Sequence, residues 1–238
     1  DDVCESHGAT FKGKKLGSIG QISNFSFYVG HHMSTVEGGM VCTNDEKLYQ
    51  TFRMLRAHGM VRESNSEAFK TGFHAEHPDL NPDFIFAYPA YNFRSTEINA
   101  VMGLSQLKRL DSNNEKRREN FKLFLDNLNS KMYRTELAAE GSCNYAFIVI
   151  LRKADTRLLD ELEARLRQEK VEFRRGTSGG GNQLRQPYLK RALGSMDLTK
   201  FPEVEHVHFF GYYIGNYPEL ERGKILRLCE ILNSIGTN

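Results

Sequence analysis

Two adjacent histidines lie in a segment whose residue types could carry out proton transfer. Residues 26–39 read SFYVGHHMSTVEGG, so that His31 and His32 follow a glycine and have hydroxyl side chains on either side. An imidazole gains and loses its proton near neutral pH and can therefore act as a general acid or base. A lone histidine is more often a satisfied structural group than a catalyst, so the surrounding segments must decide between the two interpretations.

Three segments together resemble the sugar-nucleotide aminotransferase family built on the aspartate-aminotransferase fold. They are residues 1–9 (DDVCESHGA), residues 26–39 and residues 91–98 (YNFRSTEI). Taken singly, Asp2 and Glu5 could be solvated surface acids, and Asn92 could cap a turn. The order and spacing of all three segments argue against a chance agreement.

This resemblance implies pyridoxal 5'-phosphate (PLP) as the cofactor and assigns residues to it. Asp2 would pair with the pyridine nitrogen, Glu5 would approach the ring hydroxyl, and Ser26 would donate its hydroxyl to the phosphate. In the family the asparagine matched by Asn92 reaches the phosphate of the neighbouring subunit's cofactor. The resemblance therefore also implies a homodimer with shared active sites.

The position of His31 is where the family has the lysine that binds PLP covalently. Counting from Ser26 and from Thr35 aligns His31, rather than His32, with this lysine. Histidine cannot form the Schiff base but retains acid and base chemistry. Within the family, this exchange marks the sugar 3-dehydratases.

The implied reaction is removal of the C3 hydroxyl from a nucleotide-linked 4-keto-6-deoxy sugar of the GDP-4-keto-6-deoxymannose type. L-glutamate would convert PLP to pyridoxamine 5'-phosphate, and His31 would act as the general base at the cofactor's C4′ carbon. The alternatives are a nucleotide-sugar aminotransferase and a noncatalytic PLP-binding homologue.

Basic residues supply candidate substrate contacts. The resemblance extends to residues 53–59 (RMLRAHG), which makes His58 and Arg62 candidates for the sugar or an organic acid, and Arg94 follows Asn92. Arg174 and Arg175 precede the glycine-rich residues 176–181 and could bind a diphosphate, although a solvated loop would also explain this stretch.

The composition limits the classes of partner that we expect for this protein. Lysine and arginine number 32 against 30 acidic residues, a net charge of +2, which gives no reason to expect nucleic acid as a partner. No apolar run approaches the roughly 20 residues of a membrane span. The four cysteines are widely scattered and predict neither a metal nor an iron–sulfur site, so we expect reduced thiols in a cytoplasmic, metal-free enzyme.

The pattern of elements predicts an α/β chain. The resemblance to the family implies the later part of an aspartate-aminotransferase-type (PLP fold type I) large domain at residues 1–120 and a small α+β domain at residues 121–238, with the N-terminal part of the family fold absent. The boundary should lie near residues 112–132. Predicted strands are 21–29, 38–43, 145–151 and 171–173, and residues 61–89 are predicted to be a long loop. Predicted helices are 46–57, 95–110, 114–130, 156–169, 182–193, 202–213 and 219–234.

Overall fold

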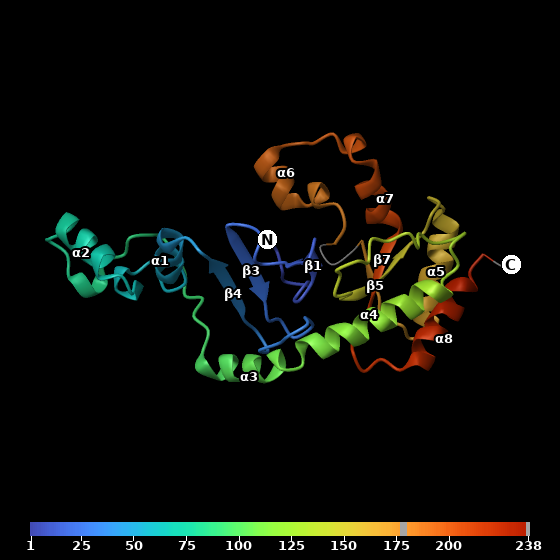
Figure 1. Cartoon of the computed structure of the whole chain (residues 1–238). Coiled ribbons are helices and arrows are strands. Elements are labelled where there is room, and N and C mark those ends of the chain that lie inside the picture. The colour runs from blue at the N-terminus through green and yellow to red at the C-terminus, as the bar shows by residue number, and fades with distance from the viewer. Residues whose placement is uncertain (177–179, 237–238) are drawn as a thin grey trace. The chain divides into compact units, whose positions relative to one another are not determined.

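The computed structural model describes residues 1–176 and 180–236, and its contacts divide the chain into two compact units, Asp1–Asp111 and Ser112–Asn238. The first is called unit 1 below and the second unit 2. Helix α4 (Leu110–Asn127) contains both this division and the boundary predicted at residue 120 (Figure 1).

The centre of unit 1 is an antiparallel hairpin of β3 (Ile22–Ser26) and β4 (Gly39–Thr43) (Figure 1). Both strands were predicted. The register pairs Ser26 with Gly39, which brings together the two ends of the segment that carries His31. A shorter hairpin, β1 (Thr10–Phe11) with β2 (Lys14–Lys15), precedes it.

The segment at residues 61–89 is not the single long loop that was predicted. It contains α2 (Glu67–Glu76) between 3-10 turns at Val61–Glu63 and Pro82–Phe84. Ser66 caps the helix by accepting a hydrogen bond from the Phe69 backbone. Only two aromatic residues of α2 pack against the small apolar cluster of unit 1, too few to give a sustained apolar period; that cluster consists of Met54, Val61 and Ile85.

Unit 1 contains two further α-helices, α1 (Glu46–Leu55) and α3 (Glu97–Leu107). Helix α1 begins after Asp45, whose side chain accepts from the Leu48 backbone. Helix α3 begins with a capping box between Thr96 and Asn99. Both helices lie within the predicted ranges.

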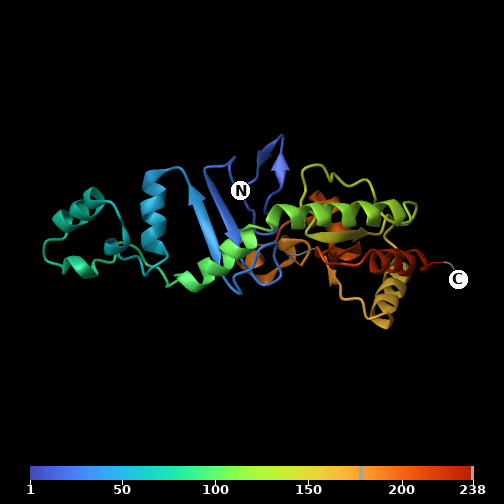
Figure 2. The ribbon, with the colours of Figure 1, turned by 60° about the horizontal axis from the view of Figure 1, so that its bottom comes forward.

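Unit 2 is built on an antiparallel sheet in the order β5-β7-β6. The core joins this sheet to α4, α5 and α8, and Figure 2 shows the later part of α4 in green beside α8 in red. The strands are β5 (Ala146–Ile150), β6 (Arg174–Arg175) and β7 (Gly211–Gly215). The remaining helices are α5 (Thr156–Gln168), α6 (Pro187–Leu193), α7 (Pro202–Phe210) and α8 (Arg222–Asn233), with 3-10 turns at Gln183–Arg185 and Leu198–Lys200.

The central strand β7 was wrongly predicted as the end of a helix. Helix α7 stops at Phe210 because the chain turns at Gly211, where a Cβ would lie only 2.5 Å from the Val207 carbonyl oxygen. Aromatic and β-branched residues follow and pair on both sides. The edge strand predicted at residues 171–173 instead pairs at Arg174–Arg175, and the helix predicted from residue 182 begins as a 3-10 turn.

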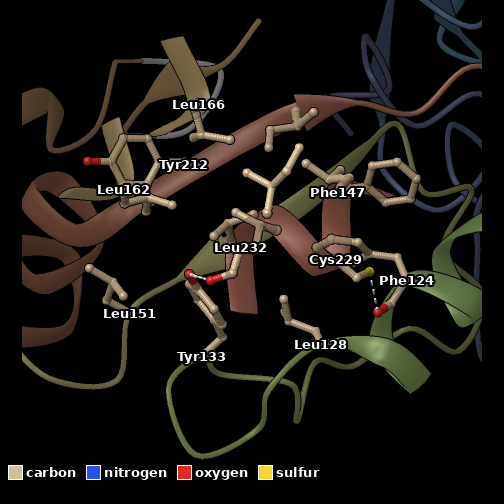
Figure 3. Close-up of a cluster of buried hydrophobic side chains, with 14 of the residues drawn as sticks. Phe124, Leu128, Tyr133, Phe147, Leu151, Leu162, Leu166, Tyr212, Cys229 and Leu232 are labelled. Atoms are coloured by element: carbon tan, nitrogen blue, oxygen red, sulfur yellow. Dashed lines mark hydrogen bonds between the residues drawn. The ribbon is translucent and has the colours of Figure 1, made fainter. Parts of the chain in front are cut away.

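The core of unit 2 is apolar and tightly interlocked (Figure 3). The rings of Phe124 and Phe147 stack with centroids 4.6 Å apart. Tyr133 is fully buried, and its hydroxyl donates to the Leu232 carbonyl at 2.7 Å. Burial raises the pKa of this phenol. Tyr133 is thus held in the core of unit 2 by both packing and a hydrogen bond.

The cysteines are free thiols: Cys143 and Cys229 are buried, and Cys4 and Cys42 are half-buried. Within residues 1–176 and 180–236, no helix is long and apolar enough to cross a membrane. The same residues contain no cluster of three His, Cys, Asp or Glu side chains that could hold a metal ion.

Candidate active site

The loop that carries His31 is closed by its own main chain. The Phe27 amide donates to the Gly38 carbonyl, and the Phe27 carbonyl accepts from the Thr35 amide, both at 2.9 Å. A Cβ at Gly38 would collide with Thr35 Oγ1, so the loop requires glycine there. Close packing inside the loop therefore explains the glycine at this position.

The imidazole of His31 lies between a carboxylate and a carbonyl. Its Nε2 is 3.8 Å from Glu5 Oε1, and its Nδ1 is 3.4 Å from the Ser26 carbonyl oxygen. The side chain is only 12% exposed, and the Tyr28 ring packs edge-on against it at 5.4 Å. This arrangement orients the ring and offers an anion to the protonated form.

Asp2 lies where the first residues run beside β3, through a bridge to Asn24. Its Oδ1 accepts from the Cys4 backbone and from Asn24 Nδ2, each at 3.1 Å. Hydrogen bonding by the Cys4 backbone is the main cause that lowers the pKa of this carboxyl. Asp2 is therefore held as an acceptor at neutral pH.

These residues fit the PLP that the sequence suggests. An ionised carboxylate is the group needed beside a protonated pyridine nitrogen, and Asp2 supplies one. Ser26 Oγ accepts from the Tyr28 backbone at 3.3 Å, which engages a lone pair and not the hydroxyl hydrogen. Asp2, Glu5, Ser26 and His31 thus converge around β3 and the loop that follows it.

Sequence reasoning missed one buried residue beside this group. His7 is 3% exposed, and its ring lies 5.8 Å from that of His32 and 5.7 Å from that of Phe25. Burial, and secondarily the charge of His31, lower the pKa of His7 to about 4, although a hydrogen bond with the Ser26 backbone opposes this.

The other predicted residues of unit 1 form a second group, on the segments after α1 and before α3. The His58 amide donates to the Tyr91 carbonyl at 2.8 Å, and Arg94 lies 4.0 Å from the Glu63 carboxylate. The exposed Asn92 accepts from the Arg94 backbone at 3.2 Å, so the turn-capping role considered above is present.

Arg62 stands beside that second group. Its guanidinium covers the Phe84 ring at 4.9 Å and donates to the Asp83 carbonyl. The Arg62 side chain is exposed and is therefore accessible to an anionic ligand.

In unit 2, Arg174 and Arg175 are consecutive residues of β6 and so point to opposite faces of the sheet. Arg174 lies 5.9 Å above the Tyr213 ring and lines a hollow of about 790 Å³. Arg175 lies 3.7 Å from Glu163 on α5. The strand therefore separates the two guanidinium groups, and residues 177–179 of the adjacent glycine-rich stretch lie outside the described residues.

The chain matches the DegT/DnrJ/EryC1/StrS aminotransferase family over residues 1–233. It belongs to this family. The predicted resemblance is confirmed, and with it membership in a family that combines helices and sheets in the aspartate-aminotransferase arrangement.

Known members are similar over nearly all of this chain. GDP-4-keto-6-deoxy-D-mannose 3-dehydratase of Yersinia pseudotuberculosis is 34% identical over 221 residues, which are 91% of this chain and 55% of that enzyme. The E. coli GDP-4-keto-6-deoxy-D-mannose-3-dehydratase, solved with bound hydrated PLP, is 28% identical with a TM-score of 0.80, covering 97% of this chain and 59% of that one.

A further structure of GDP-4-keto-6-deoxymannose-3-dehydratase holds a trapped PLP-glutamate geminal diamine. It is 28% identical to this chain with a TM-score of 0.80, covering 96% of this chain and 59% of that one. The predicted α/β fold of the family is confirmed by these likenesses. The chain spans about half the length of the curated relatives it matches.

Proposed function

We propose that this family member takes part in PLP-dependent removal of the C3 hydroxyl from a GDP-linked 4-keto-6-deoxy sugar. L-glutamate is the amino donor, and the products are the 3-deoxy-4-keto sugar nucleotide, 2-oxoglutarate and ammonia. The observation that carries this proposal is the imidazole of His31 held between Glu5 and the Ser26 carbonyl, at the position where the sequence resemblance implies the family's lysine.

His31 serves as the base. A hydrogen on Nδ1 directed at the Ser26 carbonyl leaves the lone pair on Nε2 to take up a proton. Glu5 Oε1, 3.8 Å from Nε2, then stabilises the imidazolium. The low exposure of the ring excludes bulk water from the proton it carries.

Unit 1 supplies the cofactor contacts. When bound, PLP or its pyridoxamine form supplies an electron sink that allows the C3 hydroxyl to depart. Asp2 would hold the pyridine nitrogen protonated, Glu5 would approach the ring hydroxyl, and Ser26 would donate its hydroxyl to the phosphate. Unit 1 is thereby the later part of the cofactor-binding large domain, and unit 2 is the small C-terminal domain.

The proposed assembly is a homodimer in which Asn92 contributes to the partner's site. Asn92 and both flanking aromatic residues are exposed, Tyr91 by 76% and Phe93 by 71%. Helix α3 nearby also exposes an apolar row, formed by Ile98, Val101, Leu104 and Leu107. Apolar surface of this extent is typical of protein contacts. His58, Arg62, Arg94, Arg174 and Arg175 are the proposed substrate contacts. Because Arg174 and Arg175 lie on opposite faces of β6, one anionic group would meet only one of these two guanidinium groups.

The test is product analysis with the full-length protein, PLP, L-glutamate and GDP-4-keto-6-deoxymannose. Mass spectrometry should show a sugar nucleotide that has lost one oxygen, together with ammonia. An amino sugar would instead indicate an aminotransferase, and PLP binding without any product would indicate the noncatalytic homologue.

Replacing the base gives the largest expected effect. His31→Asn should retain PLP absorbance but lower kcat about 100- to 10,000-fold, because a positioned base is lost. His32→Asn is the matched control, checked for folding by its melting temperature, and should keep most activity. Wild-type turnover by His31→Asn would contradict the proposal.

A further inference from the structure

Side chains on one face of α3 hold the backbone that follows His31. Gln106 Nε2 donates to the Ser34 carbonyl at 2.6 Å, and its Oε1 accepts from the Ser34 amide at 3.0 Å. Asn99 Nδ2 donates to the Thr35 carbonyl at 2.8 Å and to the Glu37 carbonyl at 3.3 Å. Asn99 and Gln106 are seven residues apart and therefore share a helix face.

Close approach of helix and loop depends on the residue between these two. A Cβ at Gly103 would lie 3.3 Å from Thr35 Cγ2, tighter than an ordinary contact. The small residue lets the two amide side chains reach the main chain. The α3 face and the loop are thus fitted to each other over residues 34–37.

The held backbone is strained. Val36 has φ of 73°, a left-handed conformation that a β-branched residue rarely adopts. The carbonyls on its two sides, those of Thr35 and Glu37, are the ones that receive Asn99 Nδ2. Such strain persists only where surrounding contacts over-determine the conformation, and it occurs at functional sites.

We propose that Gln106 and Asn99 are positioning residues for His31. On the N-terminal side of the two histidines the main chain fixes the turn, because the His31 amide donates to the Tyr28 carbonyl at 3.0 Å. On the C-terminal side, Gln106 fixes the backbone of Ser34. The two amides act on the imidazole through the intervening backbone, and this inference rests on the proposed role of His31 as the base.

Gln106→Met tests this positioning role, because methionine keeps the length of the side chain and removes both hydrogen bonds to Ser34. Ser105→Ala, an exposed change on the same helix, is the control. The measurements in the full-length protein are amide hydrogen exchange at Ser34, the NMR shifts of the His31 ring, and kcat with its pH profile. We expect faster exchange at Ser34, moved ring shifts, and kcat lowered about 10- to 100-fold with little change in KM, as for a misplaced catalytic group.

Asn99→Asp isolates the second contact. Asn99 Oδ1 accepts from the Thr96 amide and hydroxyl, and aspartate keeps this cap while losing the donor to the loop. Combining it with Val36→Gly gives a double-mutant cycle. Glycine adopts positive φ without strain, so Asn99→Asp should accelerate loop exchange less in the glycine background.

The readouts separate positioning from a structural role and from the proposed function. If Gln106→Met lowers the melting temperature while the His31 ring shifts and the pH profile stay as in the wild type, the positioning role is overturned. If the wild type releases no 3-deoxy product, the proposed function fails, and the exchange and ring-shift data still decide whether α3 positions His31.

Discussion

The two units differ in what holds them together. Unit 2 has a continuous apolar core of nineteen buried side chains among its described residues, whereas the buried cluster of unit 1 consists of three. Most of the large exposed apolar side chains lie in unit 1. Unit 1 relies instead on side-chain hydrogen bonds to its loops, and it carries the proposed cofactor residues.

The proposed site therefore lies in the unit with the smaller buried apolar cluster. Its residues are placed by hydrogen bonds, such as those of Gln106, Asn99 and Asn24, each with a defined direction. Apolar contacts have no such direction. A site that must orient a ring within a fraction of an ångström is better served by directional contacts.

Removing a core aromatic from unit 2 is the strongest test of the contrast. Phe147 is fully buried and stacks on Phe124, so Phe147→Ala should lower the free energy of unfolding by about 3–5 kcal/mol. Denaturant unfolding measures the loss, and amide exchange of β3 in unit 1 is the control. An equal loss of protection in β3 would show that the units do not differ as described.

Acidification should weaken unit 1 through His7. The unfolded chain binds this proton near the ordinary pKa of 6.5, while the folded chain binds it only near 4, so stability is lost as pH falls between these values. The full loss is about 3 kcal/mol. Urea unfolding at pH 7 and pH 5, together with amide exchange in unit 1, measures the larger part of this loss, about 2 kcal/mol. His7→Phe should remove this part of the pH dependence, and an unchanged dependence would rule His7 out as its source.

A buried glutamine tests the polar character of unit 1. Gln50 is 1% exposed, donates to Glu46 and Asn65 at 2.6 Å, and accepts from the Ser64 hydroxyl at 2.7 Å. Gln50→Met should lower the free energy of unfolding by about 2 kcal/mol, because Ser64 is left buried without this acceptor. Lys47→Ala on the exposed side of α1 is the control. A neutral result for Gln50→Met would mean that packing, and not hydrogen bonding, holds this region.

The smallest effect on the free energy of unfolding is expected for the Tyr133 hydroxyl, a polar group within the apolar core of unit 2. Tyr133→Phe keeps the ring and removes only the hydrogen bond to the Leu232 carbonyl, so a loss of about 1 kcal/mol is expected. Thermal unfolding of both proteins measures it. A loss as large as that of Phe147→Ala would contradict the view that packing dominates unit 2.

Residue patterns predicted those parts of the molecule that depend on neighbours along the chain. Strands β3 and β4 follow from their β-branched and aromatic residues and the intervening glycines, and Asp2, Ser26 and His31 follow from the segments that resemble the family. Strand β7 could not be separated from α7 by pattern alone, since an apolar run fits both periods until its pairing partners are known.

Long-range contacts explain the rest of what was missed. Ser34 and Gln106 are 72 positions apart, and nothing in either local segment indicates their hydrogen bonds. The same holds for the burial of His7 beside His32. Whether Arg174 and Arg175 share a ligand was likewise undecidable until β6 placed them on opposite faces.

The pairing of Ser26 with Gly39 also fixes how many residues the loop between them contains. Because side chains alternate along a strand, one residue added to or removed from β3 would turn Ser26 away and shift everything after it. The side chain at position 31 can be exchanged while the length of the loop and its Gly38 are kept. The chemistry at position 31 is therefore easier to rewrite by substitution than by insertion or deletion.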